Sequence, residues 1–395
     1  MQVKLSQILT SLESGGRPKG GASLENKGIP SLGAEHLDGN GGFNFKTVKY
    51  IPEEFFNSLK NGIIGKENIL IVKDGATTGK VSFVTDEFPF DKAAVNEHVF
   101  LLKVDKSKAN PKFVFHYLKC PQGQREIMRD FRGATVGGIS RGFVDYVKFE
   151  LPPLPDQLHI ANLLSKAENL IAQRKESIRL LDEFLKSTFL EMFGKLKGEK
   201  IPLSTVCIVN PKKSEISSLD KGLEVSFIPM AYVTEKGEIN LTQSRKLEEV
   251  WNGFTYFREN DVVFAKITPC MENGKGAIMK NLKNKIGFGT TEFHVLRPLE
   301  GLSTSEWLYH LTMQHSFRKK AEQNMTGSAG QKRVPSDFFE KFKVILPPIE
   351  LQTQFTQFVE KTETLKTQYQ QSLQELENLY GSLSQKAFRG ELLKK

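Results

Sequence analysis

An internal repeat constrains this chain more than any other feature of its sequence. The segment LPPLPDQ at 151–157 recurs 195 positions later as LPPIELQ at 346–352, and the register then holds without a gap for about forty residues. Repeats in solenoid proteins are at most about 50 residues long, so a period of this length indicates duplicated domains. The sequence therefore predicts two copies of one unit, each a globular segment followed by a long helix.

The match between the two copies is looser upstream of these motifs. Three pairs of segments correspond: NILIVKDGATTGK (68–80) with DVVFAKITPCMENGK (261–275), NEHVFLLK (96–103) with TEFHVLRP (291–298), and FRGATVGGISR (131–141) with MTGSAGQKR (325–333). We therefore expect five parts along the chain. They are a first domain at 1–150, a long helix at 151–194, a linker at 195–200, a second domain at 201–345, and a C-terminal long helix at 346–391.

Each predicted helix carries an apolar seam. No proline or glycine occurs between Pro155 and Phe193, and apolar residues recur there every seven positions, which is typical of a coiled coil. The first seam consists of Leu164, Ile171, Ile178, Leu185 and Met192. The second consists of Phe355, Val359, Tyr369, Leu373, Leu376, Tyr380, Leu383 and Ala387, and Arg174, Thr362 and Lys366 interrupt the pattern.

Matching seams predict that the two helices pack together as an antiparallel pair. This arrangement gives the chain pseudo-twofold symmetry and pushes the globular segments to opposite ends, whereas in the alternative each seam packs on its own domain. Four apolar residues lie off the seam and would stay exposed in a two-helix pair, namely Leu180, Phe184, Phe189 and Leu190. Extra apolar faces of this kind suggest that helices from another chain join the pair.

The globular segments have the pattern of mixed α/β domains. Short apolar runs such as NILIVK, HVFLLKV and DVVFAKI indicate strands bounded by turns. One helix is expected to close each segment, at 111–131 and at 304–324, before a Gly-rich loop. The predicted fold class is α+β, with two pseudo-symmetric mixed α/β domains separated by two long helices packed as an antiparallel coiled coil.

The distribution of charge favours a nucleic-acid partner. The chain has a formal net charge of +9, and +4 of it lies in each of 1–150 and 201–345, while the helical segments carry +1 and 0. A membrane-surface protein is the competing interpretation, but nearly neutral helices lack the basic amphipathic face that it requires. Two equally basic units on a neutral spacer predict two contacts with duplex DNA at a fixed distance, with two half-sites of different sequence.

Basic residues cluster in Gly-rich polar loops of each domain, where glycine lets the backbone approach phosphates and polar side chains can read base edges. Ordinary solvated turns are the alternative explanation for each loop. The candidate DNA contacts in the first domain are Arg17, Lys19, Lys73, Thr77, Thr78, Lys80, Arg132 and Arg141. Those in the second domain are Lys266, Thr268, Asn273, Lys275, Thr290, Thr291, Lys332 and Arg333.

The sequence contains no recognisable catalytic motif. GATTGK at 75–80 is one residue too short between its glycines for a P-loop and has Val81 where magnesium needs Ser or Thr. His98 and His294 lie near acidic residues in matched segments, but adjacent strand residues point to opposite faces, so we expect structural histidines. We expect no cofactor, no small-molecule ligand and no metal, and we expect the three cysteines to be inert buried thiols.

The sequence lacks the long apolar run of a transmembrane helix, and its start lacks a signal-peptide core. From these features we expect a soluble, cytoplasmic protein. Two other classes of function stay open at this point. One is an enzyme with a cryptic active site, and the other is a structural coiled-coil protein with no role at DNA.

Over nearly its whole length the chain resembles the specificity (S) subunits of type I restriction–modification enzymes. The resemblance rests on the duplicated units, on LPPLPDQ and LPPIELQ, and above all on DVVFAKITPCMENGKGAI (261–278) followed by GFGTTEFHVLRP (287–298). It implies a non-catalytic subunit that places two methyltransferase (M) subunits on a bipartite DNA target for adenine-N6 methylation. Restriction (R) subunits would complete an ATP-dependent nuclease, and the helix pair would be the scaffold on which the M subunits dock.

Overall fold

The computed structural model describes residues 2–25, 27–133, 137–328 and 330–392. The chain divides into two compact units, here called unit 1 (Met1–Lys175 with Gln371–Lys395) and unit 2 (Glu176–Gln370). Each long helix is therefore shared between the units. Ala134, Thr135, Val136 and Ala329, which belong to the predicted Gly-rich segments, lie outside the described residues.

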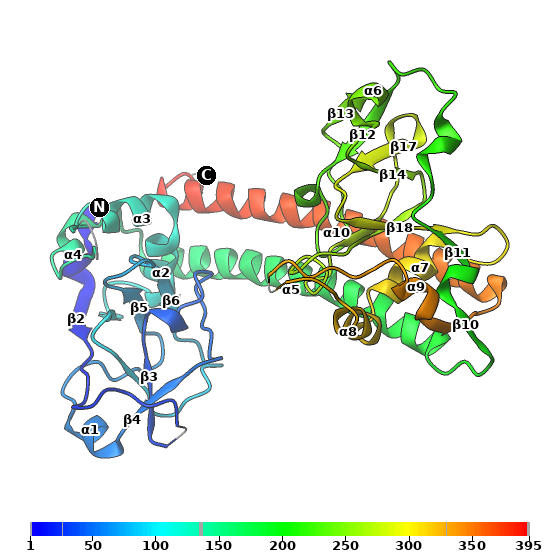
Figure 1. Ribbon diagram of the computed structural model, residues 1–395. Helices are drawn as coiled ribbons and strands as arrows, with labels where there is room; N and C mark the ends of the chain where they lie inside the picture. Colours follow the sequence, from blue (N-terminus) through cyan, green and yellow to red (C-terminus); the bar gives the residue numbers. More distant parts are fainter. Residues whose placement is uncertain (1, 26, 134–136, 329, 393–395) are drawn as a thin grey trace. The chain divides into compact units, whose positions relative to one another are not determined.

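Unit 1 contains three small sheets and four short helices beside its share of the long helices (Figure 1). The four-stranded antiparallel sheet has the order β2-β8-β5-β6, and β1 pairs with β9. In the three-stranded sheet β4-β3-β7, strand β3 is parallel to β7. The bounds are β1 Gln2–Lys4, β2 Leu9–Ser14, β3 Ile29–Leu32, β4 Lys49–Ile51, α1 Glu53–Ser58, β5 Ile69–Val72, β6 Val81–Phe83, β7 Ala94–Val95, β8 Val99–Val104, α2 Pro111–Lys119, α3 Pro121–Met128, α4 Phe143–Tyr146 and β9 Lys148–Glu150.

Unit 2 repeats this plan with one strand more. Its four-stranded sheets have the orders β11-β18-β15-β16 and β13-β12-β17-β14, and β10 pairs with β19. The bounds are β10 Lys200–Pro202, β11 Cys207–Val209, β12 Glu224–Ile228, β13 Ser244–Lys246, α6 Leu247–Val250, β14 Thr255–Arg258, β15 Val262–Ala265, β16 Gly276–Ile278, β17 Ile286–Gly289, β18 Phe293–Pro298, α7 Ser305–Thr312, α8 His315–Gln323, α9 Phe338–Lys341 and β19 Lys343–Ile345.

Strand pairing corrects one detail of the sequence repeat. Strands β5 and β15 are fully buried apolar runs and form matching central strands. Val72 at the end of β5 pairs with Val99, and Ala265 at the end of β15 pairs with Phe293. Val99 therefore corresponds to Phe293, whereas the sequence match placed it against His294. The error is one residue, and the structural register also aligns Leu102 with Leu296 and Lys103 with Arg297.

The expected single helix at the end of each globular segment is two helices in the structure. In unit 1 the break falls at Cys120, which is extended (φ −68°, ψ 158°) because it precedes Pro121 at the first position of α3. In unit 2 the break falls at Gln314, which is also extended (φ −66°, ψ 138°) without a proline. The sequence therefore held a signal for the first break only.

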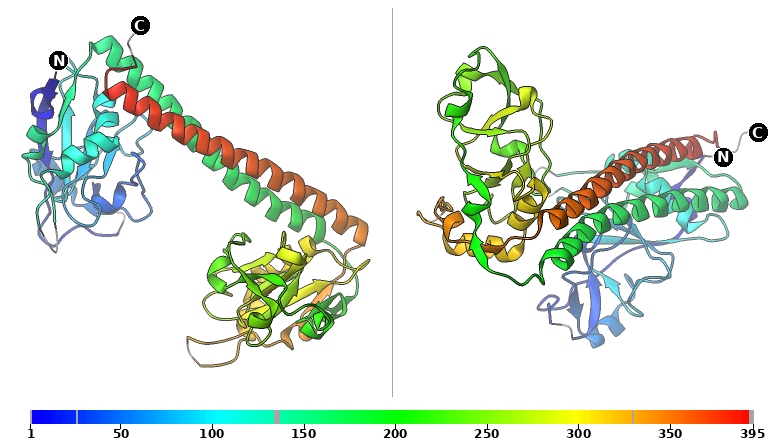
Figure 2. Two further views of the ribbon diagram at one scale, coloured as in Figure 1. Left: turned by 90° about the horizontal axis from the view of Figure 1, so that it is seen from above. Right: turned by 90° about the vertical axis from the view of Figure 1, so that its right-hand side faces the viewer.

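The long helices are α5 (Leu154–Phe193) and α10 (Ile349–Phe388). In unit 1 the first half of α5 lies beside the last half of α10 (Figure 2). Ile160 and Leu164 share a core cluster with Phe388, and Glu168 accepts a hydrogen bond from the hydroxyl of Tyr380 at 2.7 Å. The residue numbers rise on one helix as they fall on the other, so the pairing is antiparallel, as predicted.

Unit 2 contains the other halves of the two helices, again antiparallel. Leu185 and Phe189 share a core cluster with Phe355 and Val359. Lys366, which interrupts the seam, is buried and its ammonium lies 2.8 Å from Asp182. A buried charge must be paired, and α5 supplies the partner. In both units the helices also pack on the globular domain, so the two packing arrangements considered from the sequence are combined.

The structure shows where the four apolar residues that lie off the seam are placed. Phe189 was expected to be exposed, but it is buried against Phe193 and Phe355 with ring centroids 4.9 and 5.4 Å away. Leu180, Phe184 and Leu190 are exposed, as predicted.

Among the described residues, no helix combines the length and the apolar character that a membrane span requires.

Candidate nucleic-acid interface

The loop between β5 and β6 in unit 1 is a tight turn that depends on glycine. Gly75 and Gly79 have φ angles of +95° and +87°, in a region that glycine adopts far more readily than other residues. The Thr78 hydroxyl donates to the carbonyl oxygen of Gly75 at 2.7 Å and so closes the turn from within. The same hydroxyl lies 3.5 Å from the carbonyl oxygen of Gly137, so it also links the turn to the second loop segment.

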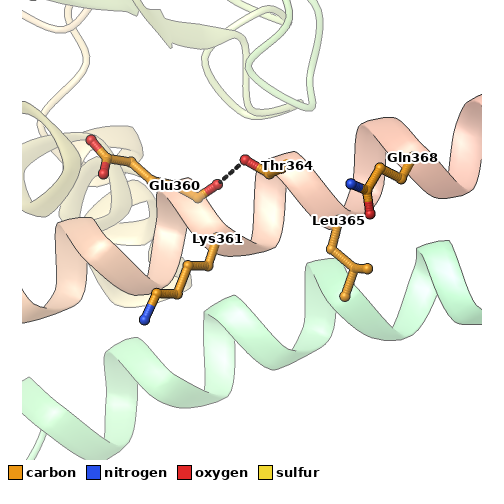
Figure 3. A pocket seen from close by; sticks show the side chains of 5 residues that line it. All are labelled: Glu360, Lys361, Thr364, Leu365 and Gln368. Atoms are coloured by element: carbon orange, nitrogen blue, oxygen red, sulfur yellow. Dashed lines mark hydrogen bonds between the residues drawn. The ribbon is translucent and has the colours of Figure 1, made fainter.

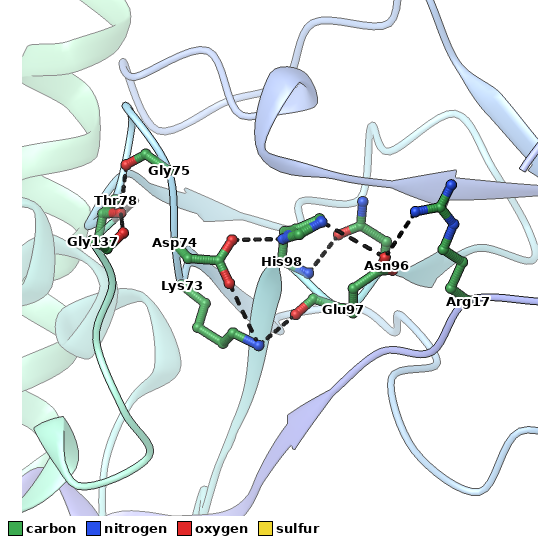
Figure 4. A network of polar contacts seen from close by, with 9 residues as sticks. All are labelled: Arg17, Lys73, Asp74, Gly75, Thr78, Asn96, Glu97, His98 and Gly137. Carbon is green, nitrogen blue, oxygen red and sulfur yellow. Dashed lines mark hydrogen bonds and ion pairs between the residues drawn. The ribbon is translucent and has the colours of Figure 1, made fainter. Parts of the chain in front are cut away.

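Charged side chains lie beside this loop (Figure 4). Lys73 Nζ donates to the backbone oxygen of Glu97 at 2.8 Å and lies 3.6 Å from the Asp74 carboxylate. Asp74 Oδ1 lies 2.6 Å from His98 Nδ1, and the Arg17 guanidinium lies 3.7 Å from the Glu97 carboxylate. The structure thus brings two predicted DNA contacts, Arg17 and Lys73, into one network with two acids and a histidine.

A second segment of unit 1 adjoins the β5–β6 loop. Isolated backbone bridges join Gly138 both to Asp74 and to Arg132. The Arg132 side chain is exposed and lies 3.5 Å from Asp130, and the exposed Arg141 donates to the backbone oxygen of Leu12. The other predicted contacts of unit 1 have exposed or half-buried side chains, namely Lys19, Thr77 and Lys80.

In unit 2 the corresponding network is built differently. Arg333 donates two hydrogen bonds to the Glu292 carboxylate, from Nε to Oε2 and from Nη2 to Oε1, each at 2.9 Å. The hydrogen bond from Arg333 is the main cause that lowers the pKa of Glu292. A bidentate pair of this kind is strong and oriented, so Arg333 holds the loop in place.

Other predicted contacts of unit 2 divide into engaged and exposed side chains. The Thr268 hydroxyl donates to Glu272 Oε1 at 2.8 Å, and Lys275 Nζ donates to the backbone oxygen of Met230 at 3.4 Å. The hydroxyl of Thr290 accepts a hydrogen bond from the backbone of Glu292 at 3.2 Å. Lys266 is half-buried, and the exposed side chains are those of Asn273, Thr291 and Lys332.

The two units share one backbone frame in this region but differ in side chains. The backbone N–H of Lys73 donates to the oxygen of His98 at 2.8 Å, and that of Lys266 donates to the oxygen of Glu292 at 2.9 Å. By the same bridges, Gly138 of unit 1 corresponds to Arg333 of unit 2. His98 therefore takes the place of Glu292, and a glycine takes the place of the arginine.

The histidines predicted to be structural behave differently from one another. His294 is buried, and its Nε2 donates to the backbone oxygen of Val334 at 2.7 Å. Burial lowers the pKa of His294 to about 4, so it is neutral near pH 7, as expected of a structural histidine. His98 is half-exposed and lies in the turn before β8, where both Asp74 and Glu97 approach its ring within 3.6 Å. The opposite-face argument is wrong there because these residues are not in a strand.

The buried His294 predicts a pH dependence of the stability of unit 2. Its folded pKa of about 4 lies below the ordinary value near 6.5, so the unfolded chain binds a proton first and stability is lost as pH falls from about 6.5 towards 4. His294→Gln should reduce the slope of unfolding free energy against pH by about 1.4 kcal/mol per pH unit in that window. Urea unfolding followed by tryptophan fluorescence measures it, because both tryptophans, Trp251 and Trp307, lie in unit 2.

The exposed His315 of the same unit is the matched control, and His315→Gln should leave the slope nearly unchanged. Equal slopes for the wild type and His294→Gln would contradict the assignment of a neutral, buried imidazole.

A pair of glutamines explains the repeated LPP motifs and was missed from the sequence. Gln157 is buried, its Oε1 accepts from the backbone N–H of Asn110 at 2.8 Å, and its Nε2 donates to Pro152. Gln352 is buried in the same way and bonds to Thr304 and Pro347, each at 2.9 Å. Each glutamine ties the start of a long helix to the N-cap of a domain helix, α2 or α7. The signal was present as an identical letter at the end of both motifs.

Loss of this link is expected to destabilise the domain. Gln352→Ala leaves the N–H of Thr304 and two carbonyl oxygens without their partner, so the unfolding free energy of unit 2 should fall by about 1–3 kcal/mol. Gln354→Ala, an exposed position two residues away, is the control and should change it by less than about 0.5 kcal/mol. Similar losses for both variants would show that Gln352 has no special role.

The shallow hollow along α10 does not have the features of a catalytic centre. It has a volume of about 370 Å³ and is lined by Glu360, Lys361, Thr364, Leu365 and Gln368 (Figure 3). The Thr364 hydroxyl donates back to its own helix at Glu360, so these polar groups do not converge on a bound molecule. The described residues include no group of three or more His, Cys, Asp or Glu side chains that could hold a metal.

Other proteins are similar to this chain in sequence and in fold. Residues 1–180 and 199–378 each match the family model of the type I restriction modification DNA specificity domain. The chain is 40% identical over 191 residues to the specificity subunit of the type I restriction enzyme EcoAI from Escherichia coli, which covers 46% of this chain and 32% of that subunit. It is also 40% identical over 151 residues to the EcoEI specificity subunit from Escherichia coli, covering 38% of this chain and 25% of that subunit.

The alignments therefore span about a third and a quarter of the length of these curated relatives. A solved structure of the type I restriction-modification system S subunit from M. genitalium is similar in fold over 98% of this chain and 96% of that one, with a TM-score of 0.56 at 14% identity. The matched residues cover most of the sequence and divide at the internal repeat. The chain belongs to the family defined by the type I restriction modification DNA specificity domain, as its sequence predicted.

Proposed function

We propose that this chain is the DNA-recognition subunit of a type I restriction–modification complex and performs no chemistry of its own. In this proposal, recognition domains at 1–150 and 201–345 read the two halves of a bipartite, asymmetric target on double-stranded DNA. The helices at 151–194 and 346–391, with the linker at 195–200, set the gap between the halves. The observation that carries the proposal is that a specificity domain occurs twice with one backbone frame and different loop side chains.

The loops that flank β5 and β15 are the segments proposed to read the DNA sequence, and they are called the reading loops below. They combine left-handed glycines, exposed cations and small polar side chains, which suits close approach to a DNA backbone and contact with base edges. His98 stands where the other unit has Glu292, and Gly138 where it has Arg333. Different donors and acceptors on equal frames favour half-sites of different sequence.

The proposed partners are two M subunits and, in the full complex, R subunits. The helices support docking of other chains, because Leu180, Phe184 and Leu190 are about half exposed although they are large and apolar. Bound M subunits would flip and methylate adenine at N6, and R subunits would add ATP-dependent cleavage of unmodified DNA. Such a complex would act on DNA in the cytoplasm.

The experiment that tests this proposal is methylome sequencing of cells that express the chain together with the M subunit of its own system. We expect one methylated motif made of two different half-sites separated by a gap of fixed length. Cells that express the M subunit without this chain should lack the motif. Methylation without a bipartite motif, or methylation by the purified chain alone, would contradict the proposal.

A further inference from the structure

A basic hollow in unit 1 lies beside the β5–β6 loop and includes Arg132 of the segment that adjoins this loop. It has a volume of about 520 Å³, and charged and polar side chains form most of its wall. Four of these side chains are cationic and two are carboxylates. The lining residues are Lys4, Arg129, Asp130, Arg132, Ser140, Gly142, Asp145, Tyr146 and Lys148.

The two lysines that line this hollow face each other across a pair of strands. Lys4 on β1 and Lys148 on β9 are direct partners in the antiparallel register, and both are exposed. Opposite residues in such a pair have Cβ atoms about 4.5–5.5 Å apart, so two ammonium groups there destabilise the pairing. Within the described ranges, neither lysine side chain has an ion pair with an acid. An anion placed between them would turn this repulsion into binding.

Both carboxylates of the hollow contact its walls, although Asp130 Oδ1 is buried and has no hydrogen-bond partner among the described residues. Asp130 is buried and accepts hydrogen bonds from the backbone N–H and the hydroxyl of Ser140 at 2.7 and 2.6 Å. Asp145 accepts from the hydroxyl of Ser6 at 2.7 Å. Asp130 also holds the Arg132 guanidinium at 3.5 Å. Both acids therefore bond to groups around the hollow, and the four cations that line the hollow outnumber its two carboxylates.

Unit 2 shows that the fold does not need these cations. Its corresponding strands β10 and β19 place Pro202 opposite Lys343, so no pair of lysines faces across them. Thr326 makes the bridge that Arg132 makes in unit 1, and counting back three residues puts Gln323 where unit 1 has Arg129. The cation cluster is thus a property of unit 1, and the corresponding strands of unit 2 form without it.

We infer that this hollow binds a backbone phosphate of duplex DNA beside the half-site that unit 1 reads. The inference rests on the proposed function and adds a contact that its reading loops do not include. Arg132 belongs to both places, because its bridge to Gly138 continues to Asp74 at the base of the β5–β6 loop. Lys and Arg at a phosphate fix the position of a protein on DNA without reading its sequence.

The test uses the full chain and a fluorescent duplex of mixed sequence, because a phosphate contact does not depend on the target. The double variant Lys4→Gln with Lys148→Gln should bind this duplex about tenfold more weakly at low salt, and its slope of log affinity against log salt should be shallower by about 1. The loss should be equal on unrelated duplexes. Its melting temperature should be equal to that of the wild type or higher, since two like charges are removed.

The internal repeat supplies the matched control. Lys200→Gln with Lys343→Gln removes the same charge from the corresponding strands of unit 2, where the lysines do not face each other, and should leave affinity within about twofold. Lys4→Glu gives a sharper readout. It replaces a like-charge pair with an opposite-charge pair, so it should raise the melting temperature while weakening DNA binding more than Lys4→Gln does.

The outcomes separate this inference from the proposed function. Wild-type protein that binds no duplex even together with its M subunit would contradict the proposed function itself. Wild-type binding with an unchanged salt slope in the Lys4/Lys148 double variant, or with equal losses in the unit 2 control, would overturn the phosphate contact alone. The inference would also be overturned if inorganic phosphate raised the melting temperature of the wild type only, while both proteins bound DNA equally. That result would assign the hollow to a free anion.

Discussion

Removal of one heptad from each long helix is expected to shorten the gap in the methylated DNA motif and to leave both half-site sequences unchanged. The deletion removes 169–175 from α5 and the facing 373–379 from α10, a choice that follows from the Lys175–Glu377 ion pair at 2.8 Å. Seven residues preserve the seven-residue seam and remove about 10 Å of helix, or about three base pairs of DNA. Methylome sequencing of cells that express the variant with its M subunit measures the gap.

Deletion of 169–175 alone is the control. It shortens α5 while α10 keeps its length, so the Glu168–Tyr380 and Asp182–Lys366 contacts cannot both form, and it should abolish methylation instead of shifting the motif. The paired deletion spares the glutamine links at Gln157 and Gln352 and the Asp182–Lys366 ion pair. Altered half-site sequences at an unchanged gap would refute the idea that the helices act as the spacer.

Asp261→Ala is expected to lower the unfolding free energy of unit 2 by about 3–5 kcal/mol. Asp261 and Arg297 are both buried, and Arg297 donates to the two carboxylate oxygens, from Nε and Nη2, each at 2.7 Å. Removal of the acid leaves a buried guanidinium whose remaining acidic partner is the half-buried Glu215. Urea unfolding followed by the fluorescence of Trp251 and Trp307 measures the loss, since both tryptophans lie in unit 2.

Two further variants test whether the loss of stability comes from the unpaired charge of Arg297. Asp261→Ala combined with Arg297→Met should recover much of the loss, because no unpaired charge then stays buried. Glu224→Ala, which breaks the exposed ion pair with Lys283, should leave the unfolding midpoint nearly unchanged. A loss for Asp261→Ala no larger than that for Glu224→Ala would mean that solvent reaches Arg297 readily.

The sequence marked the loops that are proposed to contact DNA, but it did not show which of their side chains contact one another. Gly-rich loops with clustered cations marked the segments that contain Lys73, Arg132, Lys266 and Arg333, because composition is a local property. The pairing of Asp74 with His98 was not visible, since 24 positions separate them in the chain and only the turn before β8 brings them together. The Arg333–Glu292 pair was hidden in the same way.

The sequence by itself determined the duplication, the two long helices, their antiparallel partnership and the family. The first three rest on residues that repeat, either across 195 positions or every seven residues, and the family rests above all on the motifs at 261–278 and 287–298, so all four could be recognised without knowledge of the fold. The tertiary structure decided which side chains meet across the chain. The buried glutamine links, the Lys366–Asp182 pair, the burial of Phe189 and the facing Lys4 and Lys148 all depend on the folded backbone. All of these contacts were hidden for one physical reason. Burial and charge pairing depend on distances in space, and the separation of two residues along the sequence does not give those distances.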